Sequence, residues 1–329
     1  MIAYDPARFS AALLASDAAA GTSLVPLDGE DALAFAIDAV LEPIRARDPS
    51  TPANETLMRE VLERSAERGD LFAIVLREGV RAGFVWTSAN GPPEHTEIYL
   101  NELSLVAPAR GTGLGTALLA SLERAARAAG VRAIDLDFMA DNERVRSLYE
   151  RSGYTQVGVE VIGPLGEPRG VTRDISAARE SERETLLARA VTSGAFRSFA
   201  RPHWTQAEVQ AAIDRAYAAQ TVLVAREGGE VAGAAYWRMA PSITYGDVLC
   251  VLDVLDAPAA LAPELVDAVC SAVGPGGAAR VLVTIPEPSA GVLAALAPVG
   301  LRPHRYKLAK RLVHGPPPVI GEALGSSSA

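Results

Sequence analysis

The segment 101–115 restricts the fold of this chain more than any other stretch. Its sequence, Asn-Glu-Leu-Ser-Leu-Val-Ala-Pro-Ala-Arg-Gly-Thr-Gly-Leu-Gly, takes a hydrophobic run through a proline into a glycine-rich turn. Residues 116–128 follow with leucine and alanine at helical spacing, so we expect a strand, a tight turn and a helix. Glycine allows backbone angles that a Cβ forbids, and N–H groups at a helix start can then face a ligand. This arrangement predicts a site for a phosphate group, because the helix dipole adds partial positive charge there.

Three phosphate-binding patterns can be compared with this turn. The Walker sequence needs Gly-Lys followed by Ser or Thr, and the chain has none. The dinucleotide fingerprint begins at Gly111 and Gly113 but meets Thr116 where a third small residue is needed. Because Asp135 and Asp137 follow about twenty residues on, a nucleotide-cofactor enzyme on a Rossmann-like sheet stays an open hypothesis.

The pattern that fits is Arg-x-x-Gly-x-Gly, formed by Arg110, Gly113 and Gly115. In this motif the chain resembles the GCN5-related N-acetyltransferase (GNAT) family, where the same motif grips the pyrophosphate of acetyl-coenzyme A (acetyl-CoA). Residues 142–154 extend the resemblance, since they match the family pattern Asn-x-x-Ala-x-x-Leu/Phe-Tyr-x-x-x-Gly-Phe. The one departure is Val145, which stands where the family has a small residue.

The resemblance implies an acyltransferase with a mixed α/β sheet. Its acetyl-CoA co-substrate would pass the acetyl group directly to a primary amine of a small molecule or of a protein, without a metal. Glu102 is the first candidate for the base that removes the amine proton, and Glu97, expected to be exposed, is a weaker one. Strand alternation places Glu102 and Ser104 on one face. Tyr149 is the candidate general acid for the departing thiolate.

The resemblance implies a cofactor site formed by the end of the expected strand, the glycine-rich turn and the start of the second motif. It comprises Leu105, Val106, Arg110, Gly111, Thr112, Gly113, Leu114, Gly115, Thr116 and Asn142. A backbone N–H near Leu105 or Val106 would hold the oxyanion. Simpler roles stay open: Glu102 could only satisfy an arginine or a backbone group, Tyr149 could only pack and hydrogen-bond the cofactor, and Asn142 could be a plain helix cap. A non-catalytic acyl-CoA-binding or sensing protein is therefore the alternative function.

An internal repeat indicates two tandem halves. Residues 76–83 are echoed by residues 225–233, and Gly153-Tyr154 is matched by Gly300-Leu301. We predict a competent GNAT domain in residues 1–176, a degenerate GNAT-like domain in residues 177–314 and a disordered tail in residues 315–329. Two hairpins are expected in the first half, one of residues 71–76 with 81–87 and one of residues 156–162 with 170–175.

The second half lacks the chemistry of the first. The stretch 255–264, where the phosphate turn should lie, has no glycine. Its two prolines remove N–H groups that a pyrophosphate would need, and Asp256 and Glu264 would repel the ligand. We interpret this half as a copy that packs on the first and helps to enclose the acceptor.

Composition excludes several other classes of function. The chain carries 31 basic and 40 acidic residues, which argues against nucleic acid as a partner. Cys250 and Cys270 lie in apolar stretches outside the glycine-turn half, so an acyl-cysteine mechanism has no support, and the four histidines lack metal-ligand spacing. Without a signal peptide or a membrane-length apolar run, we expect a soluble cytoplasmic protein, monomeric or homodimeric, that does not bind membranes.

Overall fold

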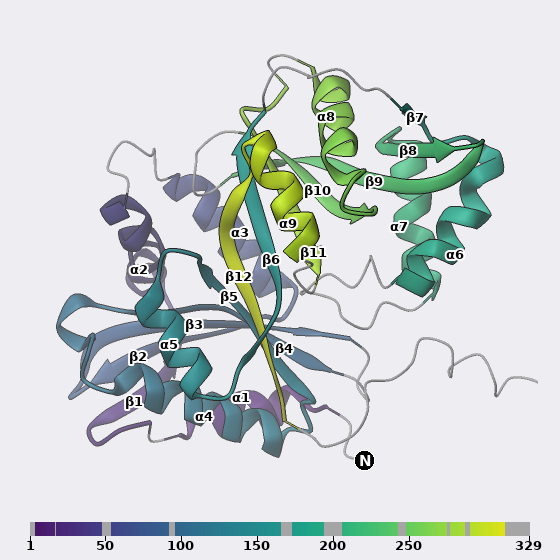
Figure 1. Ribbon diagram of the computed structural model, residues 1–329. Helices are drawn as coiled ribbons and strands as arrows, with labels where there is room; N and C mark the ends of the chain where they lie inside the picture. The colour runs from purple at the N-terminus through teal and green to yellow at the C-terminus, as the bar shows by residue number, and fades with distance from the viewer. Residues whose placement is uncertain are drawn as a thin grey trace, which may run out of the picture.

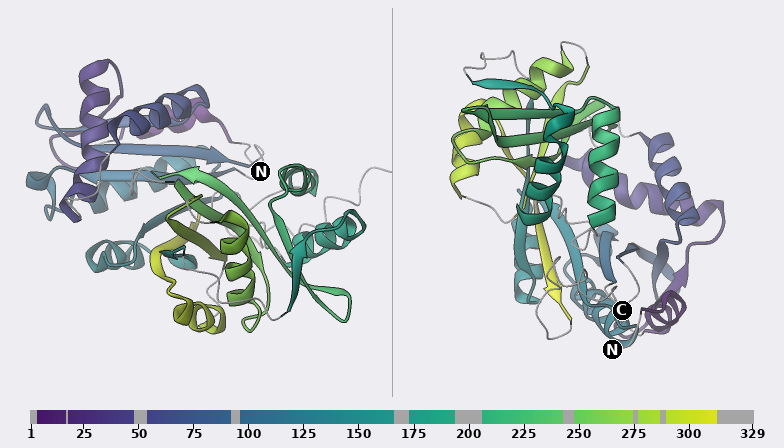
Figure 2. Two further views of the ribbon diagram at one scale, coloured as in Figure 1. Left: turned by 90° about the horizontal axis from the view of Figure 1, so that it is seen from above. Right: turned by 90° about the vertical axis from the view of Figure 1, so that its right-hand side faces the viewer.

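The strands of this protein join into a single twelve-stranded sheet, with the order β1-β2-β3-β4-β5-β12-β6-β11-β10-β9-β8-β7. The computed structural model describes residues 4–16, 18–47, 54–91, 96–165, 173–193, 206–242, 248–274, 277–286 and 290–312. Helices lie on both faces of the sheet in each half of the molecule (Figure 1 and Figure 2). No helix in these ranges is long and apolar enough to cross a membrane.

The two halves repeat one order of elements. After α1 (Pro6–Leu14), the first half contains β1 (Thr22–Pro26), α2 (Glu30–Arg47), α3 (Glu55–Glu67), β2 (Leu71–Arg77), β3 (Val80–Asn90), β4 (Glu97–Leu105), α4 (Leu114–Ala128), β5 (Ala133–Met139), α5 (Glu143–Arg151) and β6 (Thr155–Pro164). The second contains β7 (Asp174–Ala177), α6 (Arg183–Ser193), α7 (Gln206–Ala218), β8 (Val222–Glu227), β9 (Glu230–Pro241), β10 (Val248–Asp256), α8 (Ala262–Val273), β11 (Arg280–Pro286), α9 (Ala290–Leu296) and β12 (Arg302–Arg311). The predicted repeat and the mixed α/β sheet are both confirmed.

Glycines mark the repeat in three dimensions. A Cβ on Gly83 of β3 would lie 2.4 Å from the carbonyl oxygen of Ser104, and one on Gly233 of β9 would lie 3.0 Å from that of Asp256. Both glycines thus let the second strand of a hairpin approach the end of the third strand. Gly153 and Gly300, with φ of +84° and +88°, reverse the chain before β6 and β12.

The two halves exchange their last strands. β12 lies between β5 and β6, where Leu308 is opposite Leu136, and β6 lies between β12 and β11, where Val161 is opposite Val283. Figure 1 shows β6 and β12 side by side at the junction. Leu308 is buried in the core under α4, and Val161 is buried in the core under α8. Each half therefore completes its hydrophobic core with a strand of the other.

This exchange overturns one prediction. The expected hairpin of residues 156–162 with 170–175 is wrong, because β6 pairs with β11 and β12 while Ile175 of β7 pairs with Ala225 of β8. Alternation of apolar residues identified β6 as a strand, but it carries no information on which strand lies beside it. The predicted division at residues 176 and 177 stays a prediction, and the predicted tail lies outside the described residues.

Both lysines of the chain lie on β12 and hold it in the first half. Lys310 Nζ donates to Glu123 Oε2 of α4 and to the Ser152 carbonyl oxygen, each at 2.6 Å. Lys307 Nζ lies 2.9 Å from Glu160 Oε1 of β6 and 3.6 Å from Asp137 Oδ2 of β5. Both lysines of the chain thus bind residues at the junction between the two halves.

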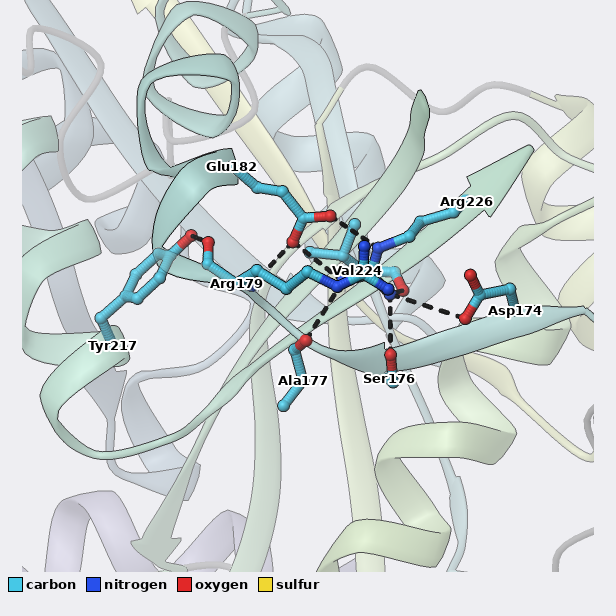
Figure 3. Close-up of polar contacts among 8 residues, drawn as sticks. All are labelled: Asp174, Ser176, Ala177, Arg179, Glu182, Tyr217, Val224 and Arg226. Atoms are coloured by element: carbon cyan, nitrogen blue, oxygen red, sulfur yellow. Dashed lines mark hydrogen bonds and ion pairs between the residues drawn. The ribbon is translucent and has the colours of Figure 1, made fainter. Parts of the chain in front are cut away.

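A buried arginine fastens the outer edge of the second half (Figure 3). Arg226 of β8 has a side chain only 1% exposed, and it donates to both carboxylate oxygens of Glu182, at 2.6 and 2.8 Å. It also donates to Ser176 Oγ at 2.7 Å and to the Ala177 carbonyl oxygen at 3.2 Å. This network ties edge strand β7 and the start of α6 to β8.

We predict that Arg226→Ala lowers the free energy of unfolding by about 3–5 kcal/mol, because it leaves the Glu182 carboxylate buried without its partner. Urea unfolding measures the loss. Arg45→Ala is the matched control: its pairs with Asp38 and Glu55 are exposed and should cost at most about 1 kcal/mol. Equal losses in the two variants would show that the network does not stabilise the fold.

Candidate active site

The sheet opens between β4 and β5. These parallel strands pair from Glu97 opposite Ala133 as far as Leu100 opposite Leu136, and the rest of β4 pairs only with β3. A β-bulge begins the separation, since Leu100 is opposite Thr87 and Glu102 is opposite Trp86, with Asn101 as the extra residue. Bulges of this kind turn a strand and re-aim the side chains that follow. The residues after Asn101 therefore face an opening.

One backbone N–H points into this opening. Val106 donates its N–H to the Ala82 carbonyl oxygen at 3.0 Å, so this hydrogen bond links β4 to β3. In an antiparallel ladder bonded and non-bonded pairs alternate, and Leu105, opposite Gly83, falls in a non-bonded pair. The N–H of Leu105 is thus directed away from β3, toward the gap. Of the two oxyanion donors predicted from the sequence, Leu105 is the available one.

The glycine turn has the predicted shape. A short 3-10 helix (Ala107–Ala109) precedes Gly111 and Gly113, whose φ angles are +79° and +86°. Helix α4 begins at Leu114, two residues before the predicted Thr116, so Gly115 and Thr116 lie in its first turn. The first N–H groups of a helix have no intrahelical acceptor. A Cβ on Gly113 would meet no atom within 4 Å, so these N–H groups border open space.

Side chains hold the turn in place. Thr112 Oγ1 donates to the Ala109 carbonyl oxygen at 2.9 Å. Arg110 donates from Nε to the Leu105 carbonyl oxygen at 2.7 Å and from Nη2 to Glu42 Oε2 of α2 at 2.5 Å. Arg110 therefore links the turn, the end of β4 and α2, and a forked contact with a phosphate would require it to release Glu42.

A second arginine at the turn escaped the sequence analysis. Arg144, in the first turn of α5, places Nη2 3.0 Å from the position of a Cβ on Gly111. It is exposed, and the described part of the chain offers it no hydrogen bond or ion pair. Arg144 lies two residues after Asn142 at the start of a helix, and this position is the sequence feature that could have identified it. Asn142 itself is an N-cap, since its Oδ1 accepts the Val145 N–H at 3.2 Å.

Glu102 and Tyr149 meet at the opening from opposite faces of the sheet. Leu103 and Leu105 pack in the core under α4, so Glu102 and Ser104 project from the other face, as predicted. Ser104 Oγ donates to Glu102 Oε1 at 2.5 Å. Burial raises the pKa of Glu102 to about 7, against the opposing effects of this hydrogen bond and of the Arg305 charge.

Tyr149 is buried in α5 on the α4 side, where its ring contacts Phe138 and Tyr154. Burial raises the pKa of Tyr149 above its usual value, and the negative charges of Glu102 and Asp137 raise it further. The hydroxyl therefore keeps its proton at neutral pH. It is suited to donate a proton, while Glu102 is suited to accept one.

The carboxyl groups of Asp135 and Asp137, both on β5, differ in protonation. Glu97 is buried rather than exposed, which corrects our expectation, and its carboxyl group pairs with Asp135. Burial raises the pKa of Asp135 well above its usual range, and the Glu97 charge adds to the effect. Burial acts on Asp137 in the same sense, but Arg305 and Lys307 outweigh it and lower the pKa of Asp137. Asp137 therefore stays ionised beside the opening.

The corresponding positions of the second half carry no such groups. β10 also has a bulge, at Asp253, so Val254 corresponds to Glu102. Counting back from Gly300 places buried Leu296 where Tyr149 stands. Arg189 and Arg173 pair with Asp256 and Glu264 around the helix start that replaces the glycine turn.

The cysteines and the possible metal ligands bear on two other kinds of chemistry. Burial raises the pKa of Cys250 to about 12 and that of Cys270 to about 11, so neither thiol ionises near neutral pH. In the described part of the chain, His, Cys, Asp and Glu side chains form no group of three or more that could hold a metal ion.

Comparisons with known proteins point to one family. Residues 39–154 match the model of the acetyltransferase (GNAT) family. The uncharacterized N-acetyltransferase YycN of Bacillus subtilis (strain 168) is 35% identical over 91 residues, which is 27% of this chain and 57% of that protein. The chain thus spans little more than half the length of this curated relative.

Solved structures resemble both halves together. The GCN5-related N-acetyltransferase from Sphaerobacter thermophilus superposes with a TM-score of 0.61 at 18% identity, over 92% of this chain and 98% of that one. A tandem GNAT protein from the clavulanic acid biosynthesis pathway gives 0.55 at 14% identity, over 90% and 100%. A glucosamine N-acetyltransferase region of a fungal multi-domain β-N-acetylglucosaminidase gives 0.59 at 16% identity, over 88% of this chain but 38% of that one.

At such identities the structural likeness concerns the fold, in which two copies of the family architecture follow each other. The family model matches the half that contains the sheet opening, the glycine turn and the pair of Glu102 and Tyr149. Residues 39–154 of the chain therefore match the acetyltransferase (GNAT) family, and the matched domain lies in the first half.

Proposed function

We propose that this protein is an N-acetyltransferase that uses acetyl-CoA as co-substrate and acetylates a primary amine in the first half of the chain. The observation that carries the proposal is the sheet opening flanked by an outward N–H of Leu105, a glycine turn and two proton-transfer groups. The second half, residues 177–314, supports this site without acting as a second one, because Val254 and Leu296 replace Glu102 and Tyr149.

Each group at the sheet opening has one role in the proposed reaction. The glycine turn and the first turn of α4 bind the pyrophosphate through backbone N–H groups. Glu102 takes a proton from the ammonium or attacking amine, whose nitrogen forms a bond to the acetyl carbonyl carbon. The Leu105 N–H stabilises the negative charge on the carbonyl oxygen. The carbon–sulfur bond then breaks, the thiolate receives the Tyr149 proton, and an amide and free coenzyme A leave.

We predict that Gly113→Ala weakens acetyl-CoA binding by about 10- to 100-fold, the value of one hydrogen bond to a charged group. The new methyl group would occupy the open space before the turn, and the left-handed φ would be strained. Isothermal titration calorimetry measures the affinity. Gly69→Ala is the matched control, because Gly69 also has a positive φ and an unobstructed Cβ position but lies in a remote turn. Equal affinities of the two variants would contradict the assigned site.

We predict that kcat/KM for the amine rises with pH through about 7 and then levels off, since Glu102 accepts a proton only when ionised. Glu102→Gln should lower kcat by about 10²- to 10⁴-fold and abolish this rise. Ser104→Ala should move the rise to higher pH, because the Ser104 hydrogen bond lowers the pKa of Glu102. A thiol-release assay across pH tests all three. An unchanged rise in Glu102→Gln would remove Glu102 from the mechanism.

We predict that Tyr149→Phe lowers kcat by about 10²- to 10⁴-fold, because the departing thiolate loses its proton donor. Acetyl-CoA affinity should stay unchanged, since the ring remains packed. Tyr154→Phe is the control, because Tyr154 is a second buried tyrosine whose ring centre lies 5.7 Å from that of Tyr149. If both variants turn over at the same rate, Tyr149 acts only in packing.

A further inference from the structure

Arg305 of β12 has a guanidinium group to which the described residues offer no hydrogen bond. Its shortest ion-pair distance is 3.5 Å, from Nη1 to Asp137 Oδ1, which is longer than a hydrogen bond. Its Nε is enclosed and has no acceptor. In the described part of the chain, no oxygen accepts a hydrogen bond from any of its five N–H groups. The side chain is nevertheless 33% exposed, so a ligand can reach it.

Two buried cations among the described residues, Lys307 and Arg226, have close oxygen partners, which Arg305 lacks. Lys307, two residues along the same strand, lies 2.9 Å from Glu160. Arg226 in the second half has several oxygen acceptors within 3.2 Å. Buried polar groups of native proteins are almost always paired, so an unpaired one calls for an explanation. A missing ligand is the explanation that fits a partly exposed guanidinium.

Arg305 lies on the same face of the sheet as Glu102. Tyr306 and Leu308 of β12 pack in the core under α4, so Arg305 and Lys307 project from the opposite face. Leu136 and Phe138 likewise turn Asp137 to that face. The Arg305 charge is also close enough to act on the pKa of Glu102. The strand exchange thus places a cation from the end of the chain beside the proton acceptor of the first half.

The charges around Arg305 restrict the anion that it can bind. Asp137 contacts the guanidinium directly, and the negative charges of Glu160 and Glu102 also act on it. A doubly charged phosphate would be repelled by these groups, whereas a carboxylate carries one charge and matches the planar fork of arginine. The carboxylates that oppose such an anion would attract the ammonium group of the same molecule.

We propose that Arg305 binds the carboxylate of the acceptor, so that the acceptor is an amine that also carries a carboxylate, such as an α-amino acid or a short peptide. This proposal rests on the acetyl transfer proposed above and specifies its substrate. The amine end lies at Glu102 and the carboxylate end at Arg305. The second half then contributes a substrate contact, although it has no reaction centre of its own.

The test compares acceptors in pairs that differ only in the carboxylate. Thiol release from acetyl-CoA is measured with the common α-amino acids, with dipeptides and with the carboxamide of each. The wild-type protein should prefer the carboxylate member of its best pair by about 10- to 100-fold in kcat/KM. At a pH where Glu102 is ionised in each variant, Arg305→Gln should remove this preference by raising KM for the carboxylate member, while kcat/KM for the carboxamide falls far less and KM for acetyl-CoA stays unchanged.

Two further variants separate substrate contact from structure. Arg302→Gln is the matched control, because Arg302 lies on the same strand but bonds only the carbonyl oxygens of Ala297 and Leu301. Arg305→Lys keeps the charge without the fork, and it should fold normally and retain part of the preference. Thermal unfolding shows whether each variant is folded.

Three results would overturn the proposal that Arg305 binds the acceptor carboxylate. Equal use of carboxylates and carboxamides by the wild-type protein overturns the proposal, as does an Arg305→Gln variant that loses activity on both members equally. A wild-type protein that binds acetyl-CoA yet acetylates no carboxylate acceptor also overturns it. Failure of the wild-type protein to bind acetyl-CoA in calorimetry would instead contradict the acetyl transfer itself.

Discussion

The exchange of β6 and β12 is the constraint on which the rest of this structure depends. Each strand buries aliphatic side chains in the core of the other half, and full burial of one such side chain stabilises by roughly 1.5–3 kcal/mol. Lys307 adds charge to this packing, because it joins Glu160 of β6 to Asp137 of β5. Neither half can therefore complete its sheet or its core alone. We therefore expect the two copies to unfold together, although their element order is that of two domains.

Much of the site follows from local sequence, and that part was predictable. Positive φ at Gly111 and Gly113 and the helix start after them depend on a few consecutive residues. The common face of Glu102 and Ser104 follows from strand alternation alone. The unpredicted features depend on neighbours far away in the chain. The environment of Glu97 required knowledge of Asp135 across a parallel pair, and the availability of the Leu105 N–H required the register with β3.

The same distinction explains the wrong hairpin. Apolar alternation in β6 records that one face is buried, but the burying surface, Val283 and its neighbours on β11, belongs to the second half. The repeat could be recognised at residues 225–233, because the sequence of a tight hairpin turn is a local feature. An exchange between two copies leaves no local mark, since both possible partners present similar apolar faces. Ion pairs such as Lys310 with Glu123 distinguish the partners, and they become visible only in three dimensions.

In the proposed mechanism the second half also acts on the site electrostatically, through the charges of β12. Asp137 is buried at the sheet opening, and burial alone would raise its pKa. The charges of Arg305 and Lys307 on β12 lower the pKa of Asp137 and keep the carboxylate ionised. Asp137 in turn raises the pKa of Tyr149, which keeps the tyrosine proton in place, while Arg305 limits the rise in the pKa of Glu102. We therefore expect that loss of β12 would change the protonation of both proposed proton-transfer groups, in addition to the loss of packing. In this proposal the second copy acts on the site through its last strand and needs no glycine turn of its own.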